Sequence, residues 1–166
     1  MHSSFKELET AQGTMFFLGS ISHAVEQLAG RGANGITFRA GRNIATKQNI
    51  DRHDENLLVA IESVKQEMEK MGMKWDVEVY KKKVEPSALV ETEHEYHVKL
   101  VFRNCMVRSC QFHYGHPQKN SLCMLNHGLF CGLLQKIHGS FSEYDFIHSG
   151  ENACIGLLRV KKGRAA

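Results

Sequence analysis

The sequence predicts a single α+β domain in which helices pack against a mainly antiparallel sheet. Helical periodicity fills most of the first 72 residues, whereas alternating strand patterns begin only near residue 75. Helices that precede strands, instead of alternating regularly with them, are typical of α+β folds. The chain has 166 residues, 42% hydrophobic and 23% charged, which suits one hydrophobic core and argues against disorder.

Three helices are expected before the first strand. Apolar side chains recur at steps of three and four across residues 4–29. Residues 35–47 predict a second helix that packs closely through Ala40 and Gly41. The third is predicted over 54–71, with Asp54 as its N-cap and Gly72 just beyond its C-terminus.

Strands and one further helix are expected in the second half. The segment 81–95 is polar and contains Pro86, which indicates an exposed connection or a ragged hairpin. A helix is predicted over 122–138 and ends at Gly139. Four segments have strand patterns: 75–80, 96–103, 143–149 and 153–162.

Possible metal ligands concentrate near the last helix and strand. Cys123, His127 and Cys131 are spaced four residues apart, so they share one face of the predicted helix. Glu151 and Cys154 stand three residues apart where the last strand begins. Thiolate, imidazole and carboxylate are the ligand types that hold zinc, usually four at a time.

Other interpretations of the cysteines stay open. Cys105 and Cys110 precede the helix and are further candidate ligands. A group of thiolates is also compatible with iron or an iron–sulfur cluster. A buried cysteine is, alternatively, a small hydrophobic residue of the core.

Several classes of protein are not indicated. The sequence lacks GxGxxG, GxSxG and Walker A motifs, and a net charge of +3 gives no reason to expect nucleic-acid binding. No segment reaches the roughly 18 apolar residues of a membrane span, and the start lacks the apolar region of a signal peptide. A cytoplasmic location with reduced thiols is therefore expected.

Three motifs in order resemble the 4-vinyl reductase, or hydrocarbon-binding, domain family. They are GITFRAGRNIA at 35–45, CMLNHGLFCGLL at 123–134, and the pair Glu151 and Cys154. The resemblance spans roughly residues 15–162. It implies the mixed fold shared by sensor domains of aromatic-responsive bacterial activators and by a vesicle-tethering subunit.

The resemblance also implies a zinc site. In the aromatic sensors zinc is held by a cysteine of the central helix, a Glu-x-x-Cys pair and a cysteine about eight residues further on. Cys123, Glu151 and Cys154 match the first three, but Lys162 stands at the fourth position. Cys110 is the first candidate to complete the site. The alternatives are Cys131 and His127.

The function expected from the resemblance is that of a stand-alone sensor or carrier, a cytoplasmic protein that binds a small hydrophobic molecule. The N-terminal helices, about 4–72, would form a homodimer surface or contact a partner subunit, and residues of about 75–162 would hold the sheet and metal region. The alternatives are a metal-dependent enzyme, such as a reductase acting on a tetrapyrrole or hydrocarbon-like substrate, and an iron–sulfur redox module.

The expected ligand contacts are Phe38, Arg39, Arg42, Phe112 and His113. Further pocket-lining residues are expected at Phe16, Phe17, Leu57, Ile61 and Phe102.

Overall fold

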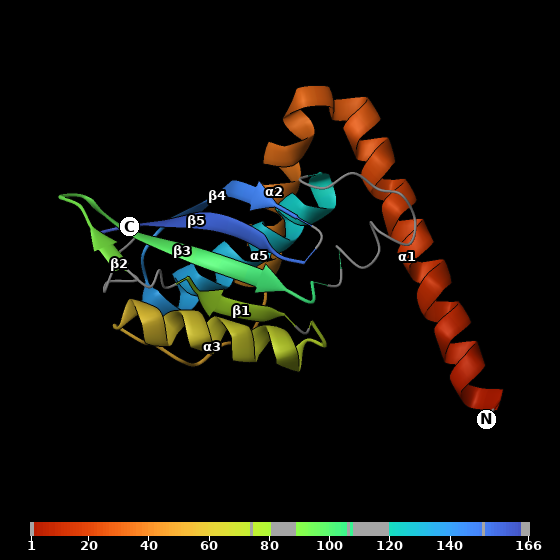
Figure 1. Cartoon of the computed structure of the whole chain (residues 1–166), viewed down its shortest axis with the longest axis horizontal. Helices are drawn as coiled ribbons and strands as arrows, with labels where there is room; N and C mark the ends of the chain where they lie inside the picture. Colours follow the sequence, from red (N-terminus) through yellow and green to blue (C-terminus); the bar gives the residue numbers. More distant parts are fainter. Residues whose placement is uncertain are drawn as a thin grey trace.

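The chain folds as an α+β domain with a five-stranded sheet and helices packed against it (Figure 1). The computed structural model describes residues 2–73, 75–80, 89–105, 107, 120–150 and 152–163, with side-chain burial from residue 12 onward. The predicted fold class is confirmed.

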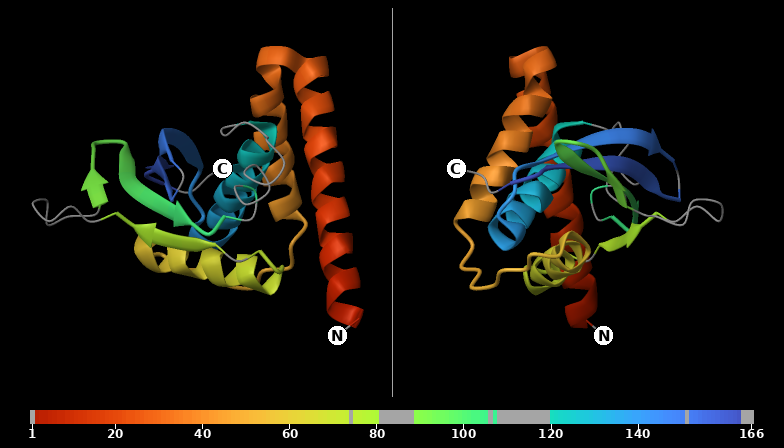
Figure 2. Two further views of the ribbon diagram at one scale, coloured as in Figure 1. Left: turned by 45° about the vertical axis from the view of Figure 1, so that its right-hand side comes forward. Right: turned by 90° about the vertical axis from the view of Figure 1, so that its left-hand side faces the viewer.

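The first two helices form a hairpin. Helix α1 spans His2–Ala29, a short 3-10 turn η1 covers Gly30–Gly32, and α2 spans Ala33–Thr46. The two helices lie side by side, and the N-terminal part of α1 extends well beyond the rest of the fold (Figure 2). The helices predicted at 4–29 and 35–47 are confirmed.

Helix α3 spans Leu57–Lys70 and begins later than the sequence predicted. Asn56 is its N-cap, because the Asn56 side chain accepts hydrogen bonds from the backbone N–H groups of Leu58 and Val59. The prediction that Asp54 caps this helix was wrong. The Asp54 carboxylate instead accepts a 2.6 Å bond from the Ser63 hydroxyl in the second turn of the helix.

Every strand pairing among the described residues is antiparallel. Strand β3, Glu95–Arg103, lies between β5, Cys154–Lys161, on one side and both β1, Asp76–Val79, and β2, Leu89–Glu91, on the other. Strand β4, Ser142–Ser149, pairs with β5 and completes the order β1-β3-β5-β4. The four predicted strands are confirmed, and β2 lies within the segment expected to be a connection or ragged hairpin.

Helix α5, Ser121–His138, is the centre of the fold. It packs on α2 and also contributes residues to the core formed with α3 and the sheet. Glycines permit the close approach of α2: a Cβ on Gly128 would lie 2.0 Å from the Phe38 carbonyl oxygen, and one on Gly41 would lie 2.0 Å from the Leu125 carbonyl oxygen. The glycine-containing motifs of the sequence therefore serve helix packing.

Within the part of the chain that the structure describes, no helix has the length and apolar character needed to cross a membrane.

Candidate functional site

Five rings meet in the interior between α5 and the sheet, and this cluster is called the His127 box. Its members are Trp75, Phe102, His127, Tyr144 and Phe146. The His127 ring is stacked on Tyr144 with centroids 4.0 Å apart and an interplanar angle of 6°. The centroids of Phe146, Phe102 and Trp75 lie 4.8, 5.0 and 5.4 Å from that of His127.

The box draws on four elements that are distant in sequence. Trp75 directly precedes β1, Phe102 is on β3, Tyr144 and Phe146 are on β4, and His127 comes from α5. Gly156 on β5 provides the space for Tyr144, because a Cβ at Gly156 would lie 1.9 Å from atoms of the Tyr144 ring. The site therefore depends on strand pairing as much as on the helix.

Three polar atoms of the box are buried without a hydrogen-bond partner among the described residues. They are Trp75 Nε1, His127 Nδ1 and the Tyr144 hydroxyl. Buried polar groups are nearly always hydrogen-bonded, since an unsatisfied one costs about 1–3 kcal/mol. Three such atoms in one cluster of touching rings make the His127 box a candidate binding site.

Burial keeps the groups of the box uncharged at neutral pH. It lowers the pKa of His127 to about 3, so the imidazole is neutral. Burial also raises the pKa of Tyr144, and nearby cysteines add to the effect, so the phenol keeps its proton. The box consequently offers neutral donors and a neutral imidazole to a ligand, which suits an uncharged partner.

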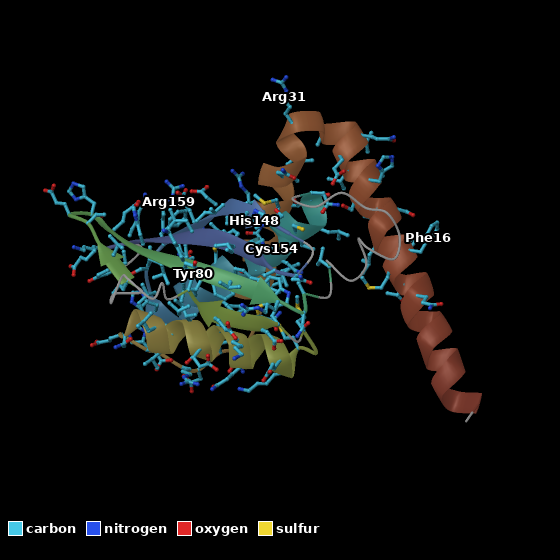
Figure 3. The ribbon with its side chains drawn as sticks, in the orientation of Figure 1. Phe16, Arg31, Tyr80, His148, Cys154 and Arg159 are labelled. Carbon is cyan, nitrogen blue, oxygen red and sulfur yellow. The ribbon has the colours of Figure 1, made fainter. Side chains whose placement is uncertain are left out.

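Cysteines form part of the core around the box: Cys131 is a member of it, and Cys105 and Cys154 pack against it. Burial is the main cause of the raised pKa of Tyr144, and the thiols of Cys154, Cys131, Cys123 and Cys105, when ionised, add to it. Cys131 is fully buried, and burial raises its pKa to about 12. Cys154 opens β5 opposite Phe102 of the box, and Figure 3 labels it.

The structure does not test the predicted metal site. Glu151 and Cys110 lie outside the described residues, and so do two predicted ligand contacts, Phe112 and His113. Among the residues that are described, no group of three histidine, cysteine or acidic side chains is arranged to hold a metal ion. The alternatives Cys131 and His127 thus form no such group with Cys123 and Cys154.

The remaining predicted ligand contacts occupy α2. Phe38 is half-buried and packs against the core, whereas Arg39 is exposed. The Arg42 guanidinium donates a 2.9 Å bond to the Ser142 carbonyl, bonds to Gln135 and lies 4.1 Å from the centroid of the Phe141 ring. Arg42 thereby joins α2 to α5 and β4.

The predicted pocket-lining residues divide between core and surface. Phe102 belongs to the His127 box, and Leu57 and Ile61 are buried in the core. Phe16 and Phe17 are 63% and 64% exposed on α1, so the prediction that they line a pocket of this chain was wrong. Figure 3 shows Phe16 projecting from α1 on the side away from the sheet.

A separate cleft of about 520 Å³ lies near the C-terminal end of α5 and the start of α3. Its lining includes His53, His138, Leu58, Tyr96 and Lys162. The Lys162 ammonium forms a 2.7 Å ion pair with Glu91, which also lines the cleft. This mixed, polar lining differs from the apolar pocket that the sequence predicted.

Sequence reasoning missed Trp75, Tyr144 and Phe146 as members of the site. The alternation of Tyr144 and Phe146 along β4 was a detectable signal that both point to one face of the sheet. Trp75 is the single tryptophan of the chain and is 3% exposed. Nothing in the local sequence indicates that its ring meets His127.

A comparison with solved structures finds a fold similar to that of one sensory domain. The chain is similar to the phenol-responsive sensory domain of the transcription activator PoxR, solved with phenol, with a TM-score of 0.58 and 12% identity. The similarity covers 89% of this chain and 74% of that chain. No protein-family model matches the sequence and no curated protein matches it, so membership of the 4-vinyl reductase family is not confirmed.

Proposed function

We propose that the chain is a ligand-binding sensor domain that takes a small, uncharged, mainly apolar molecule with one hydrogen-bonding group. The observation that carries this proposal is the set of buried polar atoms in the His127 box that lack partners among the described residues. Apolar walls with a few oriented polar groups are typical of small-molecule sites. The fold similarity to a phenol-responsive sensory domain supports the same class of function.

A planar aromatic ligand suits the box best. The rings already contact one another edge to face or stacked, and an aromatic ligand can replace such contacts with similar ones. Because the rings touch in this structure, entry of a ligand requires ring rotation or a movement of α5. A hydroxyl on the ligand would then bond to Trp75 Nε1, His127 Nδ1 or the Tyr144 hydroxyl.

Trp75 makes the proposal testable without a label. It is the single tryptophan and belongs to the box, so its fluorescence should change in a saturable way when phenol is added. Phenol should bind about 3–10-fold more tightly than toluene, because a net hydrogen bond contributes about 0.5–1.5 kcal/mol. His127→Phe should reduce this preference for phenol while leaving toluene binding measurable.

A matched variant separates the box from the cleft. Leu58→Asp places a charge in the cleft, where Leu58 is 40% exposed, and should leave the affinity for phenol unchanged. If Leu58→Asp loses phenol binding and His127→Phe binds phenol normally, the ligand site is the cleft and not the box. No saturable fluorescence change in the unaltered protein would contradict ligand binding at the box.

We also propose that zinc binds beside the box through Cys123, Glu151 and Cys154, with Cys110 or, alternatively, Cys131 or His127 as the fourth ligand. The support is the resemblance together with the position of Cys154, which opens β5 opposite Phe102 of the box, and of Cys123 in the first turn of α5. Zinc bound in this way would be structural and would stabilise the start of α5 and β5 against unfolding.

Elemental analysis of the protein, purified anaerobically, tests the zinc proposal. About one zinc per chain is expected, and Cys123→Ser should lower both the metal content and the melting temperature. Cys105→Ser should keep the metal if Cys110, Cys131 or His127 completes the site. A coloured protein that contains iron would favour the iron–sulfur alternative, and a metal-free protein would contradict both.

A second copy of the chain is the partner that we propose for α1. Phe17, Ile21 and Leu28 are spaced at four and seven residues, so they share one face of the helix. They are 64%, 45% and 89% exposed, and this outer stripe lies opposite the face that buries Gly19 and Ser22. An exposed apolar stripe on a helix is typical of an interaction surface.

A further inference from the structure

A buried polar contact joins α1 to the first turn of α5. This contact, called the α1–α5 latch, consists of Ser22, Glu26 and Ser121. Glu26 Oε1 accepts a 3.0 Å bond from the Ser121 backbone N–H and a 2.7 Å bond from the Ser121 hydroxyl. The Ser22 and Ser121 hydroxyl oxygens are 2.5 Å apart, and the Ser121 hydroxyl also lies 3.2 Å from the Ser22 carbonyl oxygen.

The latch is well placed to hold α5. Ser22 and Ser121 are 5% and 1% exposed, so their bonds are shielded from water. Burial tends to raise the pKa of Glu26, but hydrogen bonds from Ser121 and Ser22 and the nearby His23 together lower it, so Glu26 is ionised at neutral pH. A carboxylate near the first N–H groups of a helix is favourable for that helix.

The same helix carries the box. His127 follows Ser121 by six residues, which places the two about 9 Å apart along the axis of α5. An α-helix of this length moves as a stiff element, so a displacement of its first turn also displaces the His127 ring. The rings around His127 leave little free space, and ligand entry therefore depends on the position of α5.

We infer that Glu26 is a positioning residue for the His127 box, so that ligand binding in the box and docking of α1 on α5 are energetically coupled. This inference rests on the proposed function. The described hydrogen bonds of Glu26 are with Ser22 and Ser121, so it acts on the box through Ser121 and the body of α5. Because coupling between two sites is reciprocal, a ligand in the box changes the docking of α1 to the same extent as docking changes the ligand affinity. Helix α1, with its exposed outer stripe, is then the element that reports the occupied state.

Phenol titrations followed by Trp75 fluorescence test this coupling in the full chain. Glu26→Ala should change the affinity for phenol about fivefold or more, within the usual range of coupling between sites. Glu26→Gln keeps an oxygen that accepts from Ser121 and should retain most of the unaltered affinity. Gln27→Ala is the matched control, because the described contact of the Gln27 side chain is with His23 on the same helix, and its affinity should match the unaltered protein.

Amide hydrogen exchange provides a second measurement, because it reports the local opening of α1 itself. Phenol should alter the exchange of the α1 segment 19–29 in the unaltered protein and in Glu26→Gln, but not in Glu26→Ala. Equal affinities for phenol in Glu26→Ala and the unaltered protein would overturn the coupling and leave the proposed function intact. Absence of phenol binding in the unaltered protein would overturn both.

Discussion

At the scale of single residues, burial determines the charge of His127. Its pKa is lowered to about 3, whereas an unfolded histidine has a value of 6.5. Between these two pH values the unfolded chain binds more protons than the folded chain, so the free energy of unfolding falls as the pH falls through this window. The stability that depends on neutral His127 is fully present above about pH 6.5, and its loss at lower pH amounts to roughly a few kcal/mol.

His127→Phe should remove this part of the pH dependence. The variant keeps a ring stacked on Tyr144 but cannot bind a proton, so its stability should decline less than that of the unaltered protein between pH 6.5 and 4. Urea denaturation at several pH values measures the difference. His94→Gln changes a histidine that is 83% exposed and serves as the control. Parallel stability curves for His127→Phe and the unaltered protein would contradict the burial argument.

The sequence predicted the chemistry of His127 only in part. Spacing along α5 predicted that Cys123, His127 and Cys131 share one face of the helix, and His127 and Cys131 are both buried in the structure. The partners of the His127 ring come from residues before β1 and from β3 and β4. Which residues face it is fixed by strand order and register, and a single sequence does not specify either.

At the scale of elements, the contact between α2 and α5 depends on glycine. A Cβ on Gly128 would lie 2.0 Å from the Phe38 carbonyl oxygen and 2.8 Å from its carbonyl carbon, which are backbone atoms that cannot rotate away. Gly128→Ala should therefore force the helices apart and destabilise the fold by about 1–3 kcal/mol or more.

Gly35→Ala is the matched control for this prediction. Gly35 also lies within α2, but a Cβ there has open space around it. Alanine is a better helix former than glycine, so this variant should be neutral or more stable by about 0.5–1 kcal/mol. Urea denaturation compares the two variants. Equal stabilities would show that α2 and α5 can separate at little cost in free energy, which contradicts the prediction.

The sequence predicted most elements because their signals are local. Apolar periodicity and the glycines at 72 and 139, both with positive φ, marked the ends of α3 and α5 correctly. The start of α3 was misplaced because Asp54 and Asn56 are equally plausible caps by residue type. In the folded chain the Asp54 carboxylate accepts a bond from the Ser63 hydroxyl, and the Asp54 backbone N–H donates to the Ile137 carbonyl. Both are tertiary contacts, which the local sequence does not reveal.

At the scale of the whole molecule, α1 carries exposed apolar side chains that contacts within one chain do not explain. It packs on the rest of the fold through one side near α2 and α5, while its N-terminal part extends beyond the body (Figure 1). The sequence pattern predicted an amphipathic helix and, correctly, where it ends. It did not predict that large side chains such as Phe17 and Leu28 stay exposed, because periodicity identifies an apolar face but not the molecule that covers it.

If a second copy covers the outer stripe of α1, charges on the stripe should separate the copies. Ile21→Glu combined with Leu28→Glu should convert a dimer into a monomer, because association would bury the two carboxylates without partners. Light scattering coupled to size exclusion measures the mass. Ile36→Glu, at a 57% exposed position on α2, is the control and should leave the mass unchanged. A monomeric mass for the unaltered protein at every accessible concentration would contradict self-association and leave the stripe to a different partner.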